Sequence, residues 1–168
     1  MKCYKSITYS VLSLLFFLLV LPISPVYAGE TGSSRVLHRG NSTEPVTLDP
    51  HKSEDVSSGN ILRDLYEGLV TEDAKGKLIP GAAEKWSISD DGMHYTFHLR
   101  NCLAWSNGEA LTAADFIFSL RRALDPETAA PMADLLAPIV NSREVLSGSK
   151  PVEQLGVEMP DSHTLVIH

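Results

Sequence analysis

The chain has 168 residues, of which 43% are hydrophobic and 21% charged, and its formal net charge is −7. This acidic balance excludes the basic footprint that phosphate binding requires, so we expect no nucleic-acid partner and a soluble, monomeric protein. Behind the N-terminal segment described next, the remaining residues are enough for one ordinary domain and too few for two lobes.

The N-terminus has the three parts of a secretory signal peptide. Lys2 and Lys5 form a cationic start, residues 11–21 form an apolar run, and Ala28 is the small residue of a cleavage site. The alternative is a permanent anchor, but a spanning helix needs about 20 apolar residues. We predict a cleavable signal peptide over residues 1–28 and therefore an exported protein. Cleavage removes both lysines and no acidic residue, so the net charge changes from −7 to −9.

The two cysteines limit the covalent chemistry. Cys3 precedes the apolar run and does not lie at the cleavage point, so we do not expect a lipoprotein. Cys102 is then the only cysteine of the exported chain, and an internal disulfide is excluded. We expect Cys102 to be a small buried hydrophobic residue.

The first half of the chain predicts a strand, a turn and a helix. Residues 35–39 are a short strand candidate, and Asp49 precedes a proline, which favours a turn. Apolar residues at helical spacing predict a helix over residues 57–67, and Gly68 fits the left-handed position at its C-terminal cap.

A hairpin and a second helix follow. Asp91-Gly92 is a favoured turn pair, and strict alternation over residues 93–100 predicts a strand with one buried face. Thr112 and Asp115 have the spacing of a capping box for a helix that ends near residue 124. A shorter helix is expected from Met132 to Leu136, and a final strand over Leu165–Ile167.

No catalytic or metal-binding motif stands out. Gly-rich phosphate loops are absent from the sequence. His94 and His98 lie four residues apart in a predicted strand, a separation of about 13 Å that one metal ion cannot bridge without other ligands. Cys102 lacks an orienting partner for nucleophilic catalysis, and Asp90-Asp91 is typical of a turn. We therefore expect no enzyme, no cofactor and no metal. We expect a half-buried sheet core to explain the aromatic residues Trp86, Tyr95, Phe97 and Trp105.

Six short segments carry the clearest signal of the chain: residues 48–51 (LDPH), 64–69 (DLYEGL), 80–86 (PGAAEKW), 95–100 (YTFHLR), 105–109 (WSNGE) and 111–116 (LTAADF). Taken together and in this order, they resemble the oligopeptide-binding branch of the peptide and nickel class (family 5) of periplasmic solute-binding proteins. The resemblance extends from about Arg35 to Ile167.

The resemblance implies an α+β chain that forms an incomplete small lobe of a bilobal, periplasmic-binding-protein-like (type II) fold. Residues 29–67 would be an N-terminal segment of the first lobe with a peptide-contacting strand, and residues 68–168 would be the incomplete small lobe. In this family, the protein closes on an extended peptide, which it holds largely by backbone hydrogen bonds. It then delivers the peptide to the permease subunits of an inner-membrane ABC transporter.

The resemblance also implies the candidate site residues. Glu54, Asp55 and Val56 fall on the family's peptide-contacting strand, although an ordinary loop before a helix would have the same sequence. Met132 falls where oligopeptide-binding proteins have a tyrosine that contacts the ligand, and methionine cannot donate that hydroxyl hydrogen bond.

Two other functions remain open. The chain could bind another ligand of the same family (dipeptide, murein peptide, nickel or haem), or it could be a small adaptor or chaperone-like module that reuses the lobe for protein contacts. Because the family is several hundred residues long, we expect the chain alone to be marginally stable and to bind peptide weakly or not at all. We also expect the strand that stops at His168 to leave an unpaired sheet edge.

Overall fold

The computed structural model describes residues 36–168, so the predicted signal peptide lies outside the described residues. Residues 36–39 have no regular secondary structure, and the strand expected over residues 35–39 is wrong for all four of them. Residues 40–168 form one compact unit, which contains every helix and strand considered below. None of the helices in this described part has the length and apolar character needed to cross a bilayer.

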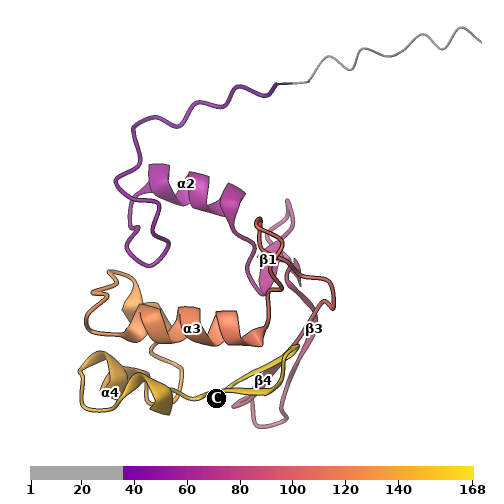
Figure 1. Cartoon of the computed structure of the whole chain (residues 1–168), viewed down its shortest axis with the longest axis vertical. Helices are drawn as coiled ribbons and strands as arrows, with labels where there is room; N and C mark the ends of the chain where they lie inside the picture. The colour runs from indigo at the N-terminus through magenta and orange to yellow at the C-terminus, as the bar shows by residue number, and fades with distance from the viewer. Residues whose placement is uncertain (1–35) are drawn as a thin grey trace, which may run out of the picture. The chain divides into compact units, whose positions relative to one another are not determined.

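The helices and strands confirm an α+β class (Figure 1). Within residues 36–168, two 3₁₀ helices accompany three α-helices, and two antiparallel sheets contain the six strands. The elements in chain order are α2 (Val56–Leu65), β1 (Val70–Glu72), β2 (Leu78–Pro80), β3 (Ala83–Ile88), β4 (Tyr95–Leu99), α3 (Ala113–Leu124), η1 (Ala133–Leu136), α4 (Ser142–Leu146), η2 (Val152–Gln154), β5 (Val157–Asp161) and β6 (Thr164–Ile167).

The larger sheet has the strand order β3-β4-β6-β5, with every neighbouring pair antiparallel. The predicted strand at the end of the chain is confirmed as β6, but its expected unpaired edge is wrong. β6 lies inside the sheet, between β4 and β5, because the chain turns tightly after Asp161 and β6 returns beside β5. β5 is an edge strand instead, and Pro160 in it lacks the N–H that an added strand would need.

The hairpin between β3 and β4 is confirmed, with Trp86 opposite Phe97 in the register. Gly92 has a φ of +73°, a backbone conformation that favours glycine, and it closes the turn by donating to the Ser89 carbonyl at 2.8 Å. Burial increases along β4, from Tyr95 at 40% exposed to Leu99 at 3%. The predicted buried face of this strand is therefore complete only at its C-terminal end.

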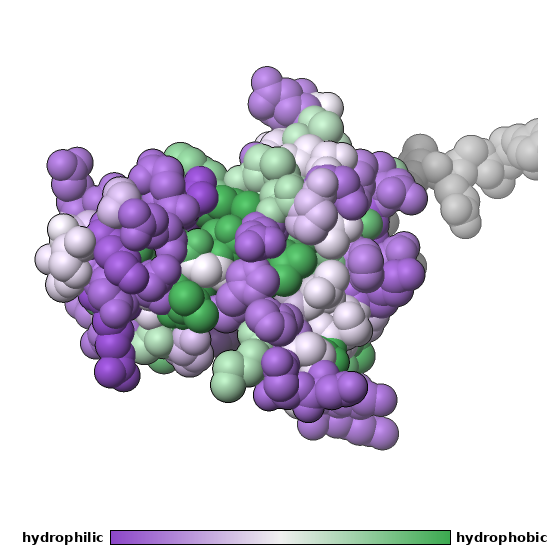
Figure 2. Space-filling view, turned by 90° about the horizontal axis from the view of Figure 1, so that it is seen from below, coloured by the Kyte–Doolittle hydropathy of each residue, from purple (hydrophilic) through white to green (hydrophobic). Residues whose placement is uncertain are grey.

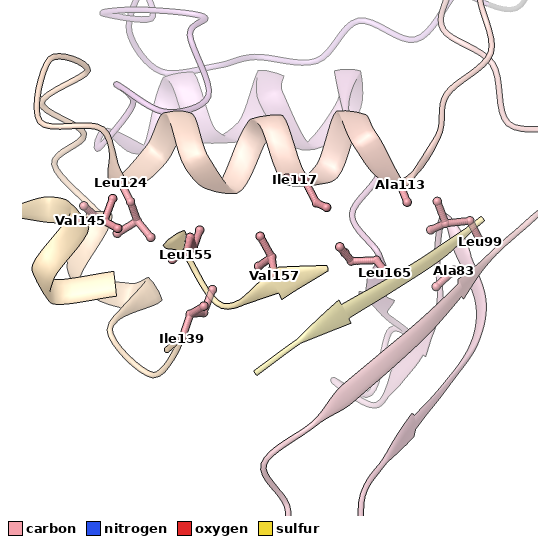
Figure 3. Close-up of a cluster of buried hydrophobic side chains, with 11 residues drawn as sticks. Ala83, Leu99, Ala113, Ile117, Leu124, Ile139, Val145, Leu155, Val157 and Leu165 are labelled. Atoms are coloured by element: carbon pink, nitrogen blue, oxygen red, sulfur yellow. The ribbon is translucent and has the colours of Figure 1, made fainter. Parts of the chain in front are cut away.

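Helix α3 packs on the β5 and β6 side of this sheet. Its N-terminus is set as predicted, since Asp115 Oδ2 accepts a hydrogen bond from Thr112 N at 2.8 Å. Figure 3 shows Ala113 and Ile117 pointing from α3 toward the strands that carry Leu99 and Leu165. Ala113 and Leu165 are fully buried, so this contact is the centre of the hydrophobic core.

Two local predictions are wrong and a third is confirmed. Helix α2 ends at Leu65 with an extended cap at Tyr66, so Gly68 is not its left-handed cap. The Gly68 carbonyl instead accepts from Ala82 N at 2.9 Å. Cys102 is exposed, because it lies in the turn between β4 and the loop that leads to α3, away from the core. The short helix expected from Met132 to Leu136 is confirmed as the 3₁₀ helix η1, with Met132 as its N-cap.

Apolar side chains also reach the surface. Figure 2 shows hydrophobic side chains gathered in the middle of one face, with hydrophilic side chains around them. Large hydrophobic residues that are more than half exposed occur on several described elements: Val56, Leu65, Leu78, Met93, Phe118, Met132 and Leu135.

Candidate ligand-binding site

The segment Glu54–Val56 is the start of α2 and not a strand. Asp55 is the N-cap residue of the helix, with φ −98° and ψ 153°, and its Oδ1 accepts from Ser58 N at 2.8 Å. Aspartate is a favoured N-cap because its carboxylate satisfies a backbone donor of the first turn. Hydrogen bonding from Ser58 lowers the pKa of Asp55, so the carboxylate stays charged. The strand predicted for residues 54–56 is therefore wrong. The role of these residues in binding peptide stays a prediction.

This helix start presents a surface that a ligand can reach. Glu54 is exposed, and Val56 is 79% exposed. Asp55 is half-buried because its carboxylate faces back toward the first turn. The chain is extended at Asp55 and helical from Val56, so ligand contacts here would involve backbone groups just before and at the first turn of a helix.

Hydroxyl groups hold the first turn of α2 against the preceding loop. Ser57 and Ser58 are buried, with 6% and 0% of their surface exposed. Ser57 Oγ donates to the Asn41 carbonyl at 3.1 Å, and Asn41 Nδ2 donates to the Ser57 carbonyl at 3.0 Å. Thr47 N donates to Ser58 Oγ at 3.3 Å. We did not predict this network, although two adjacent serines after an N-cap aspartate are its sequence signal.

A second set of contacts joins the turn at residues 49–51 to α3. Arg122 donates from Nη2 to Asp49 Oδ2 at 2.6 Å and from Nη1 to Asp49 Oδ1 at 2.8 Å. This two-point pairing is the strong geometry of a guanidinium with a carboxylate. The Arg122 hydrogen bond lowers the pKa of Asp49 far below its ordinary value. The sequence placed Asp49 in a turn and Arg122 in the last turn of a helix, but it did not show that they pair.

His51 extends this ion pair. Its Nδ1 lies 2.5 Å from Arg122 Nη1, and its Nε2 lies 3.0 Å from Ser119 Oγ. Burial lowers the pKa of His51, and the positive charge of Arg122 lowers it further, against an opposing effect of Asp49. The ring is therefore neutral at pH 7. The turn that precedes Glu54 is held on α3 by an ion pair and two further contacts.

An open groove of about 860 Å³ runs along α3 beside this junction. Lys52 lies at the end next to the 49–51 turn, and η2 and β5 form the other wall. The apolar residues that line the groove include Ile117, Phe118, Val157 and Met159, and the charged residues include Arg121, Asp125 and Glu153. The groove can accommodate an extended apolar or mixed segment, but no candidate residue from 54–56 lines it.

Met132 is on a separate segment. It lies immediately before η1, where its carbonyl accepts from Leu135 N at 3.0 Å, and its side chain is 53% exposed. A side chain this exposed is available to a ligand. In the chain order Met132 follows α3, whereas Glu54–Val56 precede it.

The groups considered for catalysis and metal binding lie apart. His94 Nδ1 lies 2.6 Å from His168 Nδ1, so His94 pairs across the sheet and not with His98. In residues 36–168, no three histidine, cysteine, aspartate or glutamate side chains converge to hold a metal ion.

Comparison with known proteins identifies the family. A protein-family model described as bacterial extracellular solute-binding proteins, family 5 Middle, matches residues 77–168. The periplasmic oligopeptide-binding protein OppA of Haemophilus influenzae is 48% identical over 130 residues, which cover 76% of this chain and 24% of that protein. The corresponding protein of Escherichia coli is 45% identical, covering 84% of this chain and 26% of its own length.

Solved structures agree with this match. The crystal structure of Haemophilus influenzae OppA in complex with the peptide RPPGFSPFR superposes with a TM-score of 0.73 and 46% identity, over 76% of this chain and 25% of that one. The Escherichia coli murein tripeptide-binding protein MppA gives a TM-score of 0.72 and 40% identity, over 74% of this chain and 25% of that one. The chain thus spans about a quarter of the length of these relatives, and it belongs to the bacterial extracellular solute-binding proteins of family 5.

Proposed function

We propose that this chain is part of a periplasmic oligopeptide-binding protein that supplies peptides to an ABC transporter. The observation that carries the proposal is its similarity to proteins named as peptide-binding, at 40% identity or more, over a stretch that includes the exposed start of α2. The partners would be an oligopeptide and the permease subunits in the inner membrane. The protein would act as a monomer, exported by a signal peptide that is cleaved and carries no lipid.

The binding mode would use backbone groups of Glu54, Asp55 and Val56. An extended peptide that pairs with backbone N–H and C=O groups gains affinity from atoms that every peptide has. Side chains of the ligand then need only space and water around them, so selectivity between sequences is low. The first turn of α2 is suited to this role because the Asn41 and Thr47 contacts of Ser57 and Ser58 fix its backbone in place.

Met132 would contribute an apolar contact and no hydrogen bond. Thioether sulfur is a weak acceptor and donates nothing. A ligand carbonyl or carboxylate near Met132 would keep its water. We expect the affinity for peptide to be lower than with tyrosine at this position. We also expect this chain alone to bind weakly, because it matches only about a quarter of the length of these relatives.

One relative supports a second ligand class. The probable deoxycholate-binding periplasmic protein YgiS of Escherichia coli is 39% identical over 92% of this chain. A bile-acid ligand would be recognised by apolar surface, which the groove along α3 offers at Ile117, Phe118 and Val157. We place this second because several peptide-binding relatives are more similar.

A ligand panel distinguishes these functions. The chain is titrated by calorimetry with RPPGFSPFR, with a tripeptide, with deoxycholate below its micelle concentration and with Ni²⁺. We expect saturable heat from the peptides only, with the weak affinity of a partial site. Saturable binding of deoxycholate or Ni²⁺ without peptide binding would overturn the proposal. Suppression of the aggregation of an unfolded client protein, with no response to any small ligand, would instead favour the adaptor function.

A further inference from the structure

The turn before α2 and the helix α3 are joined by four side chains that come from distant parts of the sequence. Asp49 and His51 belong to the turn, and Ser119 and Arg122 belong to α3. Three separate contacts cross between the two segments: the two-point ion pair of Arg122 with Asp49, the Arg122–His51 contact and the His51–Ser119 contact. We call this set, Asp49, His51, Ser119 and Arg122, the clasp.

The clasp defines the protonation state of His51. A guanidinium group has donors and no acceptor, so Nδ1 of His51 must accept from Arg122 Nη1. The ring proton is then on Nε2, which donates to Ser119 Oγ at 3.0 Å. Protonation of Nδ1 would remove the acceptor and set one cation against another. The contact between His51 and Arg122 therefore exists only with the neutral ring.

Two charged groups face the His51 ring: Arg122 from α3 and Asp49 from its own turn. They act in opposite directions on an added positive charge. Arg122 repels it, and Asp49 attracts it, but both Asp49 oxygens already accept from Arg122. The lowered pKa of His51 agrees with the greater weight of burial and of Arg122.

The turn transmits the position of the clasp to the start of α2. His51 N donates to Asp49 Oδ1 at 3.0 Å, and Lys52 N donates to the Asp49 carbonyl at 3.0 Å, so residues 49–52 form one tight unit. Only Ser53 separates that unit from Glu54. Fixing the turn on α3 thus limits where the backbone of Glu54–Val56 can lie.

We propose that Arg122 is a positioning residue for the candidate peptide-contacting segment, and that the clasp loosens when His51 is protonated. The proposal deepens the proposed function, since it assigns a pH-dependent support to the same site. In a periplasm that acidifies with the surroundings, release of the clasp would free residues 49–56 from α3 and lower the affinity for peptide, with the rest of the unit still folded.

Hydrogen exchange followed by mass spectrometry tests the clasp without a ligand. The full chain is compared at pH 7.5 and pH 5, corrected for intrinsic exchange rates, as wild type, Arg122→Lys, His51→Asn and the control Arg143→Lys on α4. Lysine keeps the charge of Arg122 and loses the two-point geometry. Asparagine keeps an acceptor near the Nδ1 position and does not titrate.

We expect wild type and Arg143→Lys to protect the amides of residues 51–57 at pH 7.5 and to exchange them at least about tenfold faster at pH 5. Arg122→Lys should exchange these amides fast at both pH values, and His51→Asn should give the same protection at both. Amides of β6 should stay protected throughout, which separates local release from global unfolding. Wild-type protection in Arg122→Lys, or a pH dependence that persists in His51→Asn, would overturn the proposal.

Peptide affinity is measured separately on the same variants. If the exchange results hold and affinity falls in parallel with protection, the clasp positions the binding segment. If the exchange results hold and no variant binds any peptide, the proposed function fails and the positioning role of Arg122 fails with it, while the clasp stands as a local fold contact.

Discussion

Gly81 lies directly against the backbone of Gly68, and a Cβ on Gly81 would be 2.4 Å from the Gly68 carbonyl oxygen. Residues 81 and 82 also donate backbone hydrogen bonds to residues 68 and 69. Gly81 N donates to the Leu69 carbonyl at 3.2 Å, and Ala82 N donates to the Gly68 carbonyl at 2.9 Å. Side chains are therefore excluded at Gly81, because the neighbour is backbone and cannot rotate away.

We predict that Gly81→Ala lowers the free energy of unfolding by roughly 2–4 kcal/mol, because the added methyl group forces the Gly68–Ala82 backbone pairing apart. Chemical denaturation measures the change. Gly40→Ala is the matched control, since nothing lies within 4 Å of its added Cβ. Equal stability of the two variants would show that the close approach of Gly81 to Gly68 is absent in solution.

Gly59 should behave in the opposite way. It lies inside α2, and an added Cβ there would meet no atom within 4 Å. Alanine loses less conformational entropy than glycine when a helix forms, so Gly59→Ala should stabilise the chain by about 0.5–1 kcal/mol. Thermal unfolding monitored by circular dichroism checks this. A lower melting temperature would mean that α2 is not helical at residue 59.

The contact between α3 and the sheet should dominate core stability. Leu165 is fully buried in β6, whereas Leu135 in η1 is 74% exposed. We expect Leu165→Ala to cost about 2–5 kcal/mol, through lost burial and a residual cavity, and Leu135→Ala to cost well under 1 kcal/mol. Both values come from urea unfolding. Similar losses for both variants would contradict the assigned core.

Stability should fall as the pH falls below about 6.5. In the folded chain the pKa of His51 is lowered from its ordinary value of 6.5. As the pH falls, the unfolded chain takes up the proton first, so the equilibrium shifts toward the unfolded state and the free energy of unfolding decreases. The pKa of Asp49 is also lowered, from 3.8, so its contribution is present above pH 3.8 and is lost below it. Unfolding free energies of wild type and His51→Asn, measured from pH 8 to pH 5, isolate the histidine contribution. If the difference in unfolding free energy between wild type and His51→Asn stays constant from pH 8 to pH 5, the predicted contribution of His51 is absent.

Met132→Tyr tests the second candidate position. A hydroxyl at this exposed site could donate to the ligand, and one net hydrogen bond of about 1 kcal/mol corresponds to an affinity gain of roughly fivefold. Met132→Leu keeps the apolar contact and should leave the affinity unchanged. Calorimetry with RPPGFSPFR compares the three proteins. An unchanged affinity in Met132→Tyr would remove residue 132 from the binding site.

Local sequence signals predicted the elements that depend on local rules. Thr112 and Asp115 predicted the start of α3, and the Asp91-Gly92 turn with its alternating neighbours predicted the β3–β4 hairpin. β5 was missed because Pro160 interrupts it and its pairing depends on β6. Cys102 was expected in the core because its residue type is usually buried, but its place in a turn decides its exposure.

The candidate site was predictable only in part. The resemblance selected residues 54–56 and implied a strand there. The strand does not form because Asp55 caps α2 and the chain is helical from Val56. The pairing of Asp49 with Arg122 joins residues 73 positions apart. No periodicity or short motif carries such a contact, because it depends on how the turn and α3 come together in space.

The proposed function requires that peptide contacts this chain at the start of α2. The most direct measurement is a ¹H–¹⁵N NMR titration of the labelled chain with RPPGFSPFR, with deoxycholate as a second ligand. We predict saturable shifts, weak in affinity, at the amides of Glu54, Asp55, Val56 and Met132 on addition of peptide. Peptide shifts confined to other residues, or shifts of these four amides with deoxycholate alone, would contradict it.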